Sequence, residues 1–245
     1  MSLSPQERSD RRAAFRRMDA RQKLDYVFTY YKVPILLGVV LLAVLCSAVH
    51  RRVTAKEPVL YAALVNVAVA EPLENALTAQ FVDWNGENPR KSEVYLYRDL
   101  YLSDDASVVN HEYAYASRLK LLGAINAKKL DVVLMNREGY DIFSRIGYLR
   151  DLSGLLSRDG ALERELTPYL TENEVILEDN AIEYNLNEAA SYEEITETVL
   201  NAVEVSGLPG LSAAGFSGSV YLGVIANSER EECVLRYLTY LLENR

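Results

Sequence analysis

The sequence predicts an α/β domain built on a parallel or mixed sheet, preceded by one transmembrane helix. Along residues 57–245, apolar segments of strand length alternate with segments in which apolar residues recur every three or four positions. Such strand–helix–strand order favours parallel pairing with right-handed crossovers and helices on both faces, a three-layer arrangement. Before this part, residues 33–49 contain no charged side chain. A run of about 17 residues reaches the lower limit for a membrane span.

The flanks of the apolar run suit a membrane interface. Val33 to Val49 reads VPILLGVVLLAVLCSAV, and tyrosines and basic residues flank it. We therefore expect a transmembrane helix over residues 33–50. A cleaved signal peptide has its apolar region close to the N-terminus, whereas about thirty residues precede this run. A retained single-pass anchor is favoured, and cleavage near Cys46-Ser47-Ala48 is the alternative.

Charge distinguishes the two sides of the run. Eight Lys or Arg precede the run, whereas only Arg51, Arg52 and Lys56 follow it within the next twenty residues. Residues 57–245 carry 15 Lys or Arg and 31 Asp or Glu, so the domain itself is acidic. The positive-inside rule then predicts a cytoplasmic N-terminus and an extracytoplasmic domain in the cell membrane. Residues 1–32 are expected to form a basic juxtamembrane helix whose arginines meet the headgroups of the lipid bilayer.

The composition of the domain excludes some classes of function. An acidic surface is unsuited to nucleic acid, which is bound through a basic one. The two cysteines, Cys46 and Cys233, lie far apart in the sequence, so no disulfide framework is expected. Cys233 follows two acidic residues, which raise the pKa of a thiol, so we expect a buried structural thiol there.

The first half of the domain is expected to contain three strand–helix units. Val59 to Val69 is apolar nearly throughout, as in a parallel strand covered on both faces. Pro72 opens a helix and Asn85-Gly86 ends it. The next elements are a strand over Glu93–Tyr97, a helix through Tyr115, Ala116, Leu119 and Leu122, a strand over Leu130–Met135, and a helix around Tyr140, Ile142, Phe143 and Ile146.

The second half of the domain is less regular. Asp179-Asn180 predicts a hairpin turn between Val175–Leu177 and Ala181–Tyr184. The segment Ser191–Ser206 begins like a capped helix but reads better as a strand over Val199–Val205. The last expected elements are a strand over Ser219–Ala226 and an amphipathic helix to Leu242.

Some of these segments carry a family resemblance. They are Leu130–Met135, Tyr140, Phe143, Gly147-Tyr148-Leu149, Asp151-Leu152, Leu155-Leu156 and Ser219–Ala226 with the helix after it. In this order they resemble bacterial extracellular solute-binding proteins, and the whole layout resembles uncharacterised bacterial single-pass membrane proteins. The resemblance implies one lobe of a periplasmic-binding-protein-like fold. Only about sixty residues, 157–218, separate the third unit from the returning strand, so the second lobe is expected to be missing or rudimentary.

No catalytic motif is complete. Of the two histidines, His50 lies at the edge of the apolar run, and His111-Glu112 lacks the second histidine of a zinc protease. The segment 215–219 approaches a nucleophile elbow but follows no strand. Ser103-Asp104-Asp105 reads as a helix cap rather than as calcium ligands. We therefore expect a non-catalytic protein without metal or cofactor, a carboxylate-dependent hydrolase being the minor alternative.

Polar and aromatic residues follow the expected strands. In open α/β sheets, ligands bind at the carboxyl ends of the strands. The candidate binding residues there are Asn66, Arg98, Asp99, Tyr101, Asn136 and Arg137. The leading interpretation is a membrane-anchored extracytoplasmic binding or scaffold domain, accessory to a transporter or envelope complex and in contact with a protein of that complex. The alternative is a receptor for a small solute, a sugar or a peptide, held by tyrosine stacking.

Overall fold

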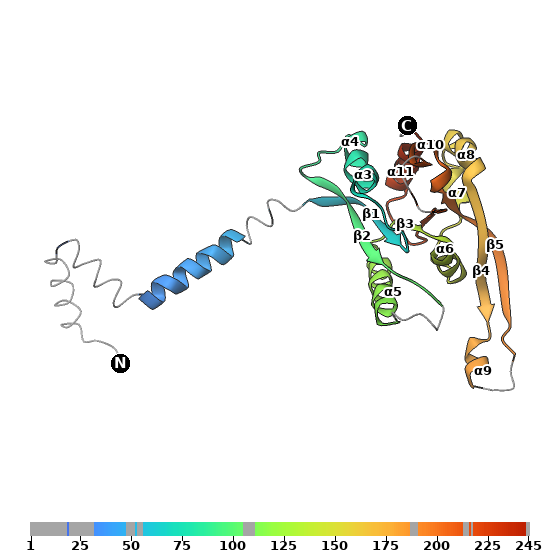
Figure 1. Cartoon of the computed structure of the whole chain (residues 1–245), viewed down its shortest axis with the longest axis horizontal. Helices are drawn as coiled ribbons and strands as arrows, with labels where there is room; N and C mark the ends of the chain where they lie inside the picture. Colours follow the sequence, from blue (N-terminus) through green and yellow to red (C-terminus); the bar gives the residue numbers. More distant parts are fainter. Residues whose placement is uncertain are drawn as a thin grey trace. The chain divides into compact units, whose positions relative to one another are not determined.

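The computed structural model describes residues 19, 32–47, 52, 56–104, 111–186, 191–212, 216 and 218–243 (Figure 1). The chain divides into two compact units, residues 1–55 and 56–245. In the first unit, residues 32–47 form a helix with exposed side chains. None of the helices in the described part of the chain has the length and apolar character that a membrane span requires. The basic helix expected over residues 1–32 lies almost wholly outside the described residues.

The second unit contains one six-stranded mixed sheet with the order β2-β1-β3-β6-β5-β4. Strand β1 pairs in parallel with both β2 and β3, while β3–β6, β6–β5 and β5–β4 are antiparallel pairs. The strands are β1 (Glu57–Val65), β2 (Ser92–Leu100), β3 (Val132–Met135), β4 (Leu170–Asp179), β5 (Glu194–Glu204) and β6 (Tyr221–Val224). The α/β class and the parallel pairing of the first three strands are thus confirmed.

Helices pack on both faces of this sheet (Figure 1). One face is covered by α3 (Glu71–Asn75), η1 (Ala76–Gln80), α4 (Phe81–Trp84), α7 (Leu152–Leu156), α8 (Gly160–Leu166), α10 (Pro209–Ser212) and α11 (Glu231–Glu243). The other face is covered by α5 (His111–Asn126) and α6 (Arg137–Arg145). The short elements η2 (Thr167–Tyr169), α9 (Ala181–Leu186) and η3 (Val205–Gly207) complete the unit.

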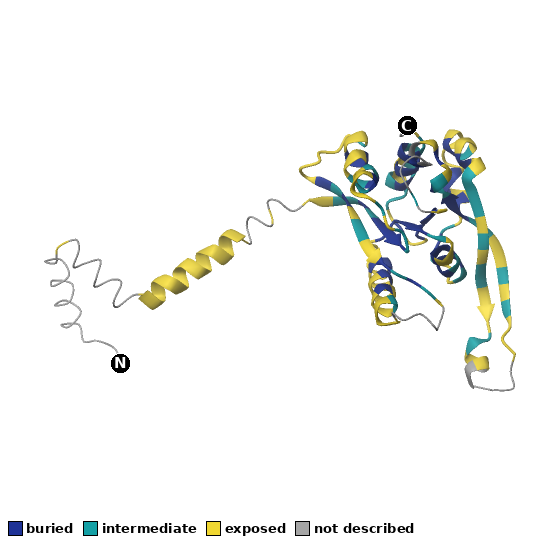
Figure 2. Cartoon of the chain, viewed as in Figure 1, coloured by how far each residue is buried: buried dark blue, intermediate teal, exposed yellow. Residues whose placement is uncertain are grey.

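The central strands are buried on both faces (Figure 2). In β1, Leu60 and Leu64 pack into the core beneath α11, and Ala63 packs into the core beneath α5 and α6. Val132 and Val133 of β3 divide between the two cores in the same way. This burial explains the nearly unbroken apolar run that predicted a strand over Val59–Val69, although the strand itself ends at Val65.

The helix that Pro72 was expected to open runs without a break through α3, η1 and α4. Its middle turn is a π-turn, which carries more residues per turn than an α-helix. Leu73, Leu77 and Phe81 recur at every fourth position, and the wider turn helps to keep all three buried on one face. The hydroxyls of Tyr237 and Tyr240 in α11 donate to backbone carbonyls of this turn, at 3.0 Å and 2.7 Å.

The helix expected through Tyr115 is present as α5, and the residues that predicted it lie on its exposed side. Tyr115, Leu119 and Leu122 are 64%, 50% and 37% exposed, and Ala116 is exposed as well. The side chains that pack on the sheet are Ser117, Leu121, Ala124 and Ile125. Apolar residues occupy two sides of this helix, so the periodicity alone did not identify the side that faces the core.

The hairpin expected around Asp179-Asn180 was also wrong. The Asp179 carboxylate accepts from the Ala181 backbone N–H at 3.1 Å, and residues 181–186 form helix α9. Strand β4 pairs instead with β5, which confirms a strand in the ambiguous segment but starts it earlier, at Glu194. The two strands extend beyond the rest of the sheet, with α9 at their far end (Figure 1). We call residues 175–198 the arm. Residues 157–218 thus add strands to the same sheet.

Candidate functional site

Two of the six candidate residues meet at the carboxyl ends of β1 and β3, as expected. The Asn66 amide donates to the Asn136 side-chain oxygen at 3.3 Å and to the Leu102 carbonyl at 2.6 Å. The Asn136 oxygen also accepts from the Gly139 backbone N–H at 2.9 Å, so this side chain caps α6. Asn66 itself has a left-handed backbone, with φ of 57°. Both amides therefore make hydrogen bonds within the protein.

Asp99 and Tyr101 connect the end of β2 to helix α5. Asp99 is left-handed, with φ of 56°, and its carbonyl accepts a hydrogen bond from the Tyr113 hydroxyl. The Tyr101 backbone N–H donates to the Ser117 hydroxyl at 3.2 Å. Both contacts join the end of β2 to α5, so the roles that the structure gives these residues are positional.

Arg137 lies at the start of α6, over aromatic rings. Its guanidinium pairs with the Asp141 carboxylate at 2.9 Å and is 5.4 Å from the ring centre of Tyr140 and 5.8 Å from that of Tyr221. Burial raises the pKa of Tyr140, whose hydroxyl donates to the Asn201 side chain at 2.7 Å. Such stacking of guanidinium on phenol rings stabilises the contact of α6 with the antiparallel strands.

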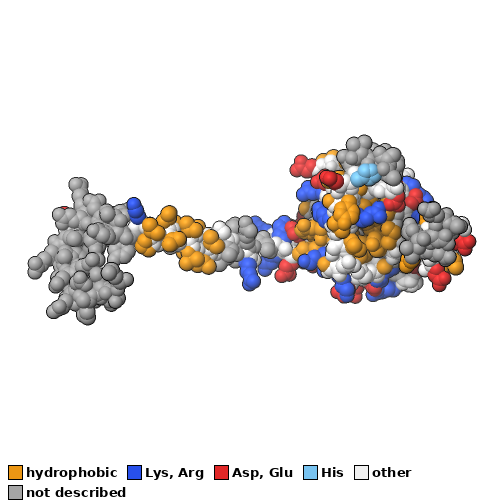
Figure 3. Space-filling view, turned by 90° about the horizontal axis from the view of Figure 1, so that it is seen from below, with side chains coloured by type: hydrophobic (Ala, Val, Ile, Leu, Met, Phe, Trp, Pro, Cys, Tyr) orange, Lys and Arg blue, Asp and Glu red, His pale blue; other side chains and the backbone are white. Residues whose placement is uncertain are grey.

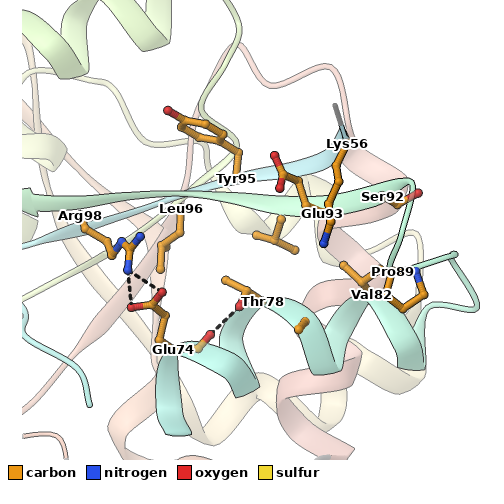
Figure 4. Close-up of a pocket in the computed structure, with 12 residues that line it drawn as sticks. Lys56, Glu74, Thr78, Val82, Pro89, Ser92, Glu93, Tyr95, Leu96 and Arg98 are labelled. Carbon is orange, nitrogen blue, oxygen red and sulfur yellow. Dashed lines mark hydrogen bonds and ion pairs between the residues drawn. The ribbon is translucent and has the colours of Figure 1, made fainter. Parts of the chain in front are cut away.

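Arg98 is separate from the other five. Its side chain reaches the helix on the opposite face of the sheet, where both Glu74 carboxylate oxygens accept from it at 2.7 Å and 2.9 Å (Figure 4). The six candidates therefore do not form one site. The carboxyl edge joins Asn66 and Asn136, whereas Arg98 marks one end of a groove.

This groove lies between strand β2 and the helical segment of residues 71–84 (Figure 4). Its volume is about 360 Å³. Val94 and Leu96 line it from the strand, and Ala79 and Val82 line it from the helix. Its polar lining residues are Lys56, Glu74, Thr78, Ser92, Glu93 and Arg98. The groove thus combines an apolar floor with charged groups.

Strand β2 is the last strand on its side of the sheet in the described part of the chain. The Glu57 N–H donates to the Lys91 carbonyl at 2.7 Å, whereas the Ser92 N–H turns the other way, to the Asn88 carbonyl at 2.8 Å. In a strand, the direction of the backbone groups alternates from residue to residue. The even-numbered residues Val94 and Leu96 therefore direct their N–H and C=O groups to the open edge and their side chains into the groove.

Three observations concern covalent or metal chemistry in the described part of the domain. Across the described residues, no three His, Cys, Asp or Glu side chains are grouped so that they could hold a metal ion. Burial, with Asp131 nearby, raises the pKa of Cys233 to about 11, so this thiol is protonated at neutral pH. The Glu74 carboxylate is engaged by Arg98.

The groove itself was not among the sequence predictions. A signal for it exists in the charged residues Lys91, Glu93 and Arg98 that flank and interrupt the second strand, because charges are typical of an edge strand. The helix that forms the other wall of the groove was predicted. The order of the strands in the sheet was not, and only that order shows that β2 is an edge strand.

Comparisons with known proteins add no further assignment. No protein-family model matches the chain, and neither a curated protein nor a solved structure matches it.

Proposed function

We propose that residues 57–245 form a non-catalytic binding domain that takes up an extended segment of a partner protein as an additional strand along β2. The observation that supports this most directly is an open edge strand beside a groove with an apolar floor. In strand addition, main-chain hydrogen bonds supply affinity, and pockets for alternate side chains supply specificity.

The lining of the groove specifies the chemistry of the bound segment. One side of an added strand faces Val94, Leu96 and Val82, so every second residue of the segment is apolar. The other side faces Tyr95, which is 44% exposed and whose ring lies on the side of β2 opposite to the helix (Figure 4). Each residue of the segment that pairs with the free groups of Val94 and Leu96 contributes to binding through the backbone as well.

We further propose that the domain is held at the outer face of the cell membrane. The apolar run and the basic residues before it favour a cell-membrane anchor with the domain outside the cytoplasm, where it acts as an accessory to a transporter or envelope complex. A solute receptor is less well supported, because the amides of Asn66 and Asn136 at the carboxyl edge already bind each other and the backbone. The groove beside β2 has its open side along a strand, which suits an extended chain.

Peptides provide a direct test of strand addition. The full chain is screened against a library of eight-residue peptides in which apolar β-branched residues alternate with polar ones, and affinity is measured by fluorescence polarisation. Each backbone nitrogen of a binding peptide is then methylated in turn. Since only alternate residues of an added strand pair with β2, methylation is expected to abolish binding at every second position. Loss of binding that does not alternate along the peptide would contradict strand addition.

Neighbouring positions on the helix supply a matched pair of variants. Ala79 lines the groove, whereas Gln80 is exposed on the same turn and does not line it. Ala79→Trp is expected to fill the groove and weaken peptide binding at least tenfold, while Gln80→Trp leaves it unchanged. Equal affinities for the two variants would place the peptide elsewhere.

A further inference from the structure

The arm carries exposed apolar side chains at the end farthest from the core (Figure 2). Ile182 is 80% exposed, Ile195 59% and Leu177 57%. Tyr184 and Tyr192 are 48% and 43% exposed, with their ring centres 5.8 Å apart. The two-stranded arm buries little of this surface against itself, and burying it on another surface would be favourable.

The arm is also uniformly acidic. Residues 175–198 include seven Asp or Glu and no Lys or Arg. The Glu194 carboxylate pairs with Arg145 of α6 at 2.6 Å, but Glu178, Glu193 and Glu197 are exposed. A surface that covers the arm must therefore be both apolar and basic, because like charges brought together would oppose the contact.

Helix α5 presents a surface of that kind on the side turned away from the sheet. Tyr115, Leu119 and Leu122 form an exposed stripe at helical spacing. From His111 to Lys129 the chain has four Lys or Arg (Arg118, Lys120, Lys128 and Lys129) and a single acidic residue. Seen from below, the domain shows hydrophobic side chains gathered beside Lys and Arg side chains (Figure 3). Arg118 pairs with Asp104 at 2.7 Å, Lys128 pairs with Glu229, and Lys120 lies over the Tyr97 ring. The stripe thus matches the arm in apolar character, and the excess of basic residues in this segment opposes the charge of the arm.

We propose that the arm of one copy of this chain docks on the α5 stripe of a second copy. Ile182 and the tyrosines of the arm would cover Leu119 and its neighbours, while the acidic residues of the arm lie against Arg118 and Lys120. Burial of apolar area supplies the affinity, and the opposite charges fix the orientation. The groove beside β2 remains open, so self-association and capture of a partner segment are separate events.

The positions of the two surfaces favour a closed pair. The arm and α5 both extend toward the same end of the domain, the lower end in Figure 1. A two-fold axis can then place each arm on the other copy's helix, which produces two identical contacts and no free end. Two contacts also double the buried surface, toward the area that stable protein interfaces need.

The self-association is tested on the full chain, purified in mild detergent, by analytical ultracentrifugation. The wild type is expected to form a dimer. Ile182→Glu and Leu119→Glu each place an acidic group in the contact and are expected to weaken the dimer at least tenfold. Ile146 is 49% exposed, close to the 50% of Leu119, but lies outside both surfaces, so Ile146→Glu is the matched control and should remain dimeric.

Cross-linking identifies the contact itself. Chains with Ile182→Cys are mixed with chains with Leu119→Cys and oxidised, and a disulfide-linked heterodimer is expected. The control mixes each variant with the wild type, which carries Cys46 and Cys233. The yield of linked dimer should be well above the yield in either control. The proposal is overturned by a monomeric wild type, by a dimer that neither glutamate variant weakens, or by equal cross-linking when Ile146→Cys replaces Leu119→Cys.

Discussion

The central strands β1, β3 and β6 differ from the paired strands β4 and β5 in how far they are buried. Every residue of β3 and of β6 is buried, and β1 is buried from Ala62 to Val65. No residue of β4 is buried, and in β5 only residues 201–203 are. All five strands belong to one hydrogen-bonded sheet, so the pairing of strands does not by itself create a core. The helices on both faces do.

The largest difference between the central strands and the β4–β5 pair is expected for a buried charge. Val132→Asp in β3 introduces an unpaired carboxylate at a position with no exposure, at a cost of about 3–5 kcal/mol, enough to unfold a marginally stable domain. The same change at Leu177, 57% exposed on the arm, should cost less than about 1 kcal/mol. Urea unfolding followed by circular dichroism measures both. A folded Val132→Asp chain would show that β3 is not a core strand.

A smaller effect is expected in β6, the central strand that pairs with β5. A Cβ atom at Gly223 in β6 would lie 2.6 Å from a Leu149 methyl group and 3.0 Å from the Met135 methyl group. Gly223→Ala should therefore destabilise the domain by about 1–3 kcal/mol through overpacking. Gly123 in α5 has no atom within 4 Å of its Cβ position, and Gly123→Ala should stabilise by up to about 1 kcal/mol. Equal unfolding midpoints would mean that β6 is loosely packed.

A still smaller effect is expected for the attachment of the arm. Arg145 pairs with Glu194 at 2.6 Å and with Glu174 at 3.6 Å, and its side chain is 39% exposed. Because solvent screens such pairs, Arg145→Ala should reduce overall stability by less than about 1 kcal/mol. Amide hydrogen exchange in β4 and β5 should nevertheless accelerate, while Arg98→Ala leaves it unchanged. If exchange in the arm is unaffected, α6 does not hold the arm in place.

The least perturbing test uses the thiol of α11. Burial raises the pKa of Cys233 to about 11, so the thiolate is scarce at pH 8 and alkylation by iodoacetamide should be slow. The rate should rise as pH approaches 11. A raised folded-state pKa also means that this group contributes stability below its unfolded pKa and loses that contribution as pH rises toward 11. Rapid labelling at pH 8 would indicate an accessible thiol. Cys46→Ser removes the other reactive site.

The same difference in burial explains how much of the fold the sequence could predict. Residues 57–65 and 132–135 read as strands because both faces are covered, which leaves a nearly continuous apolar run. In the arm, Val175, Leu177 and Ile182 are apolar but face no core, so their pattern suggested a short hairpin that does not exist. The true partner of β4 lies beyond α9, and no local signal gives that pairing.

The candidate site was predictable only in part. The meeting of Asn66 and Asn136 followed from parallel pairing, which brings the carboxyl ends of neighbouring strands together. Arg98 and Glu74 could not be paired in advance, because they are brought together by the register of β2 against a helix with a π-turn. The open edge of β2 depends on strand order, a global property that periodicity does not contain.

The charge pattern of the arm has a consequence for protein chemistry. From Glu165 to Glu229 the chain has no lysine or arginine. Trypsin, which cleaves after those residues, therefore leaves the whole arm and both of its strands within one long peptide, however accessible the arm is. A glutamate-specific protease meets the opposite situation, with exposed sites at Glu178, Glu193 and Glu197. Resistance of the arm to trypsin is therefore no evidence that the arm is covered. Cleavage by the glutamate-specific protease does report whether the arm is exposed.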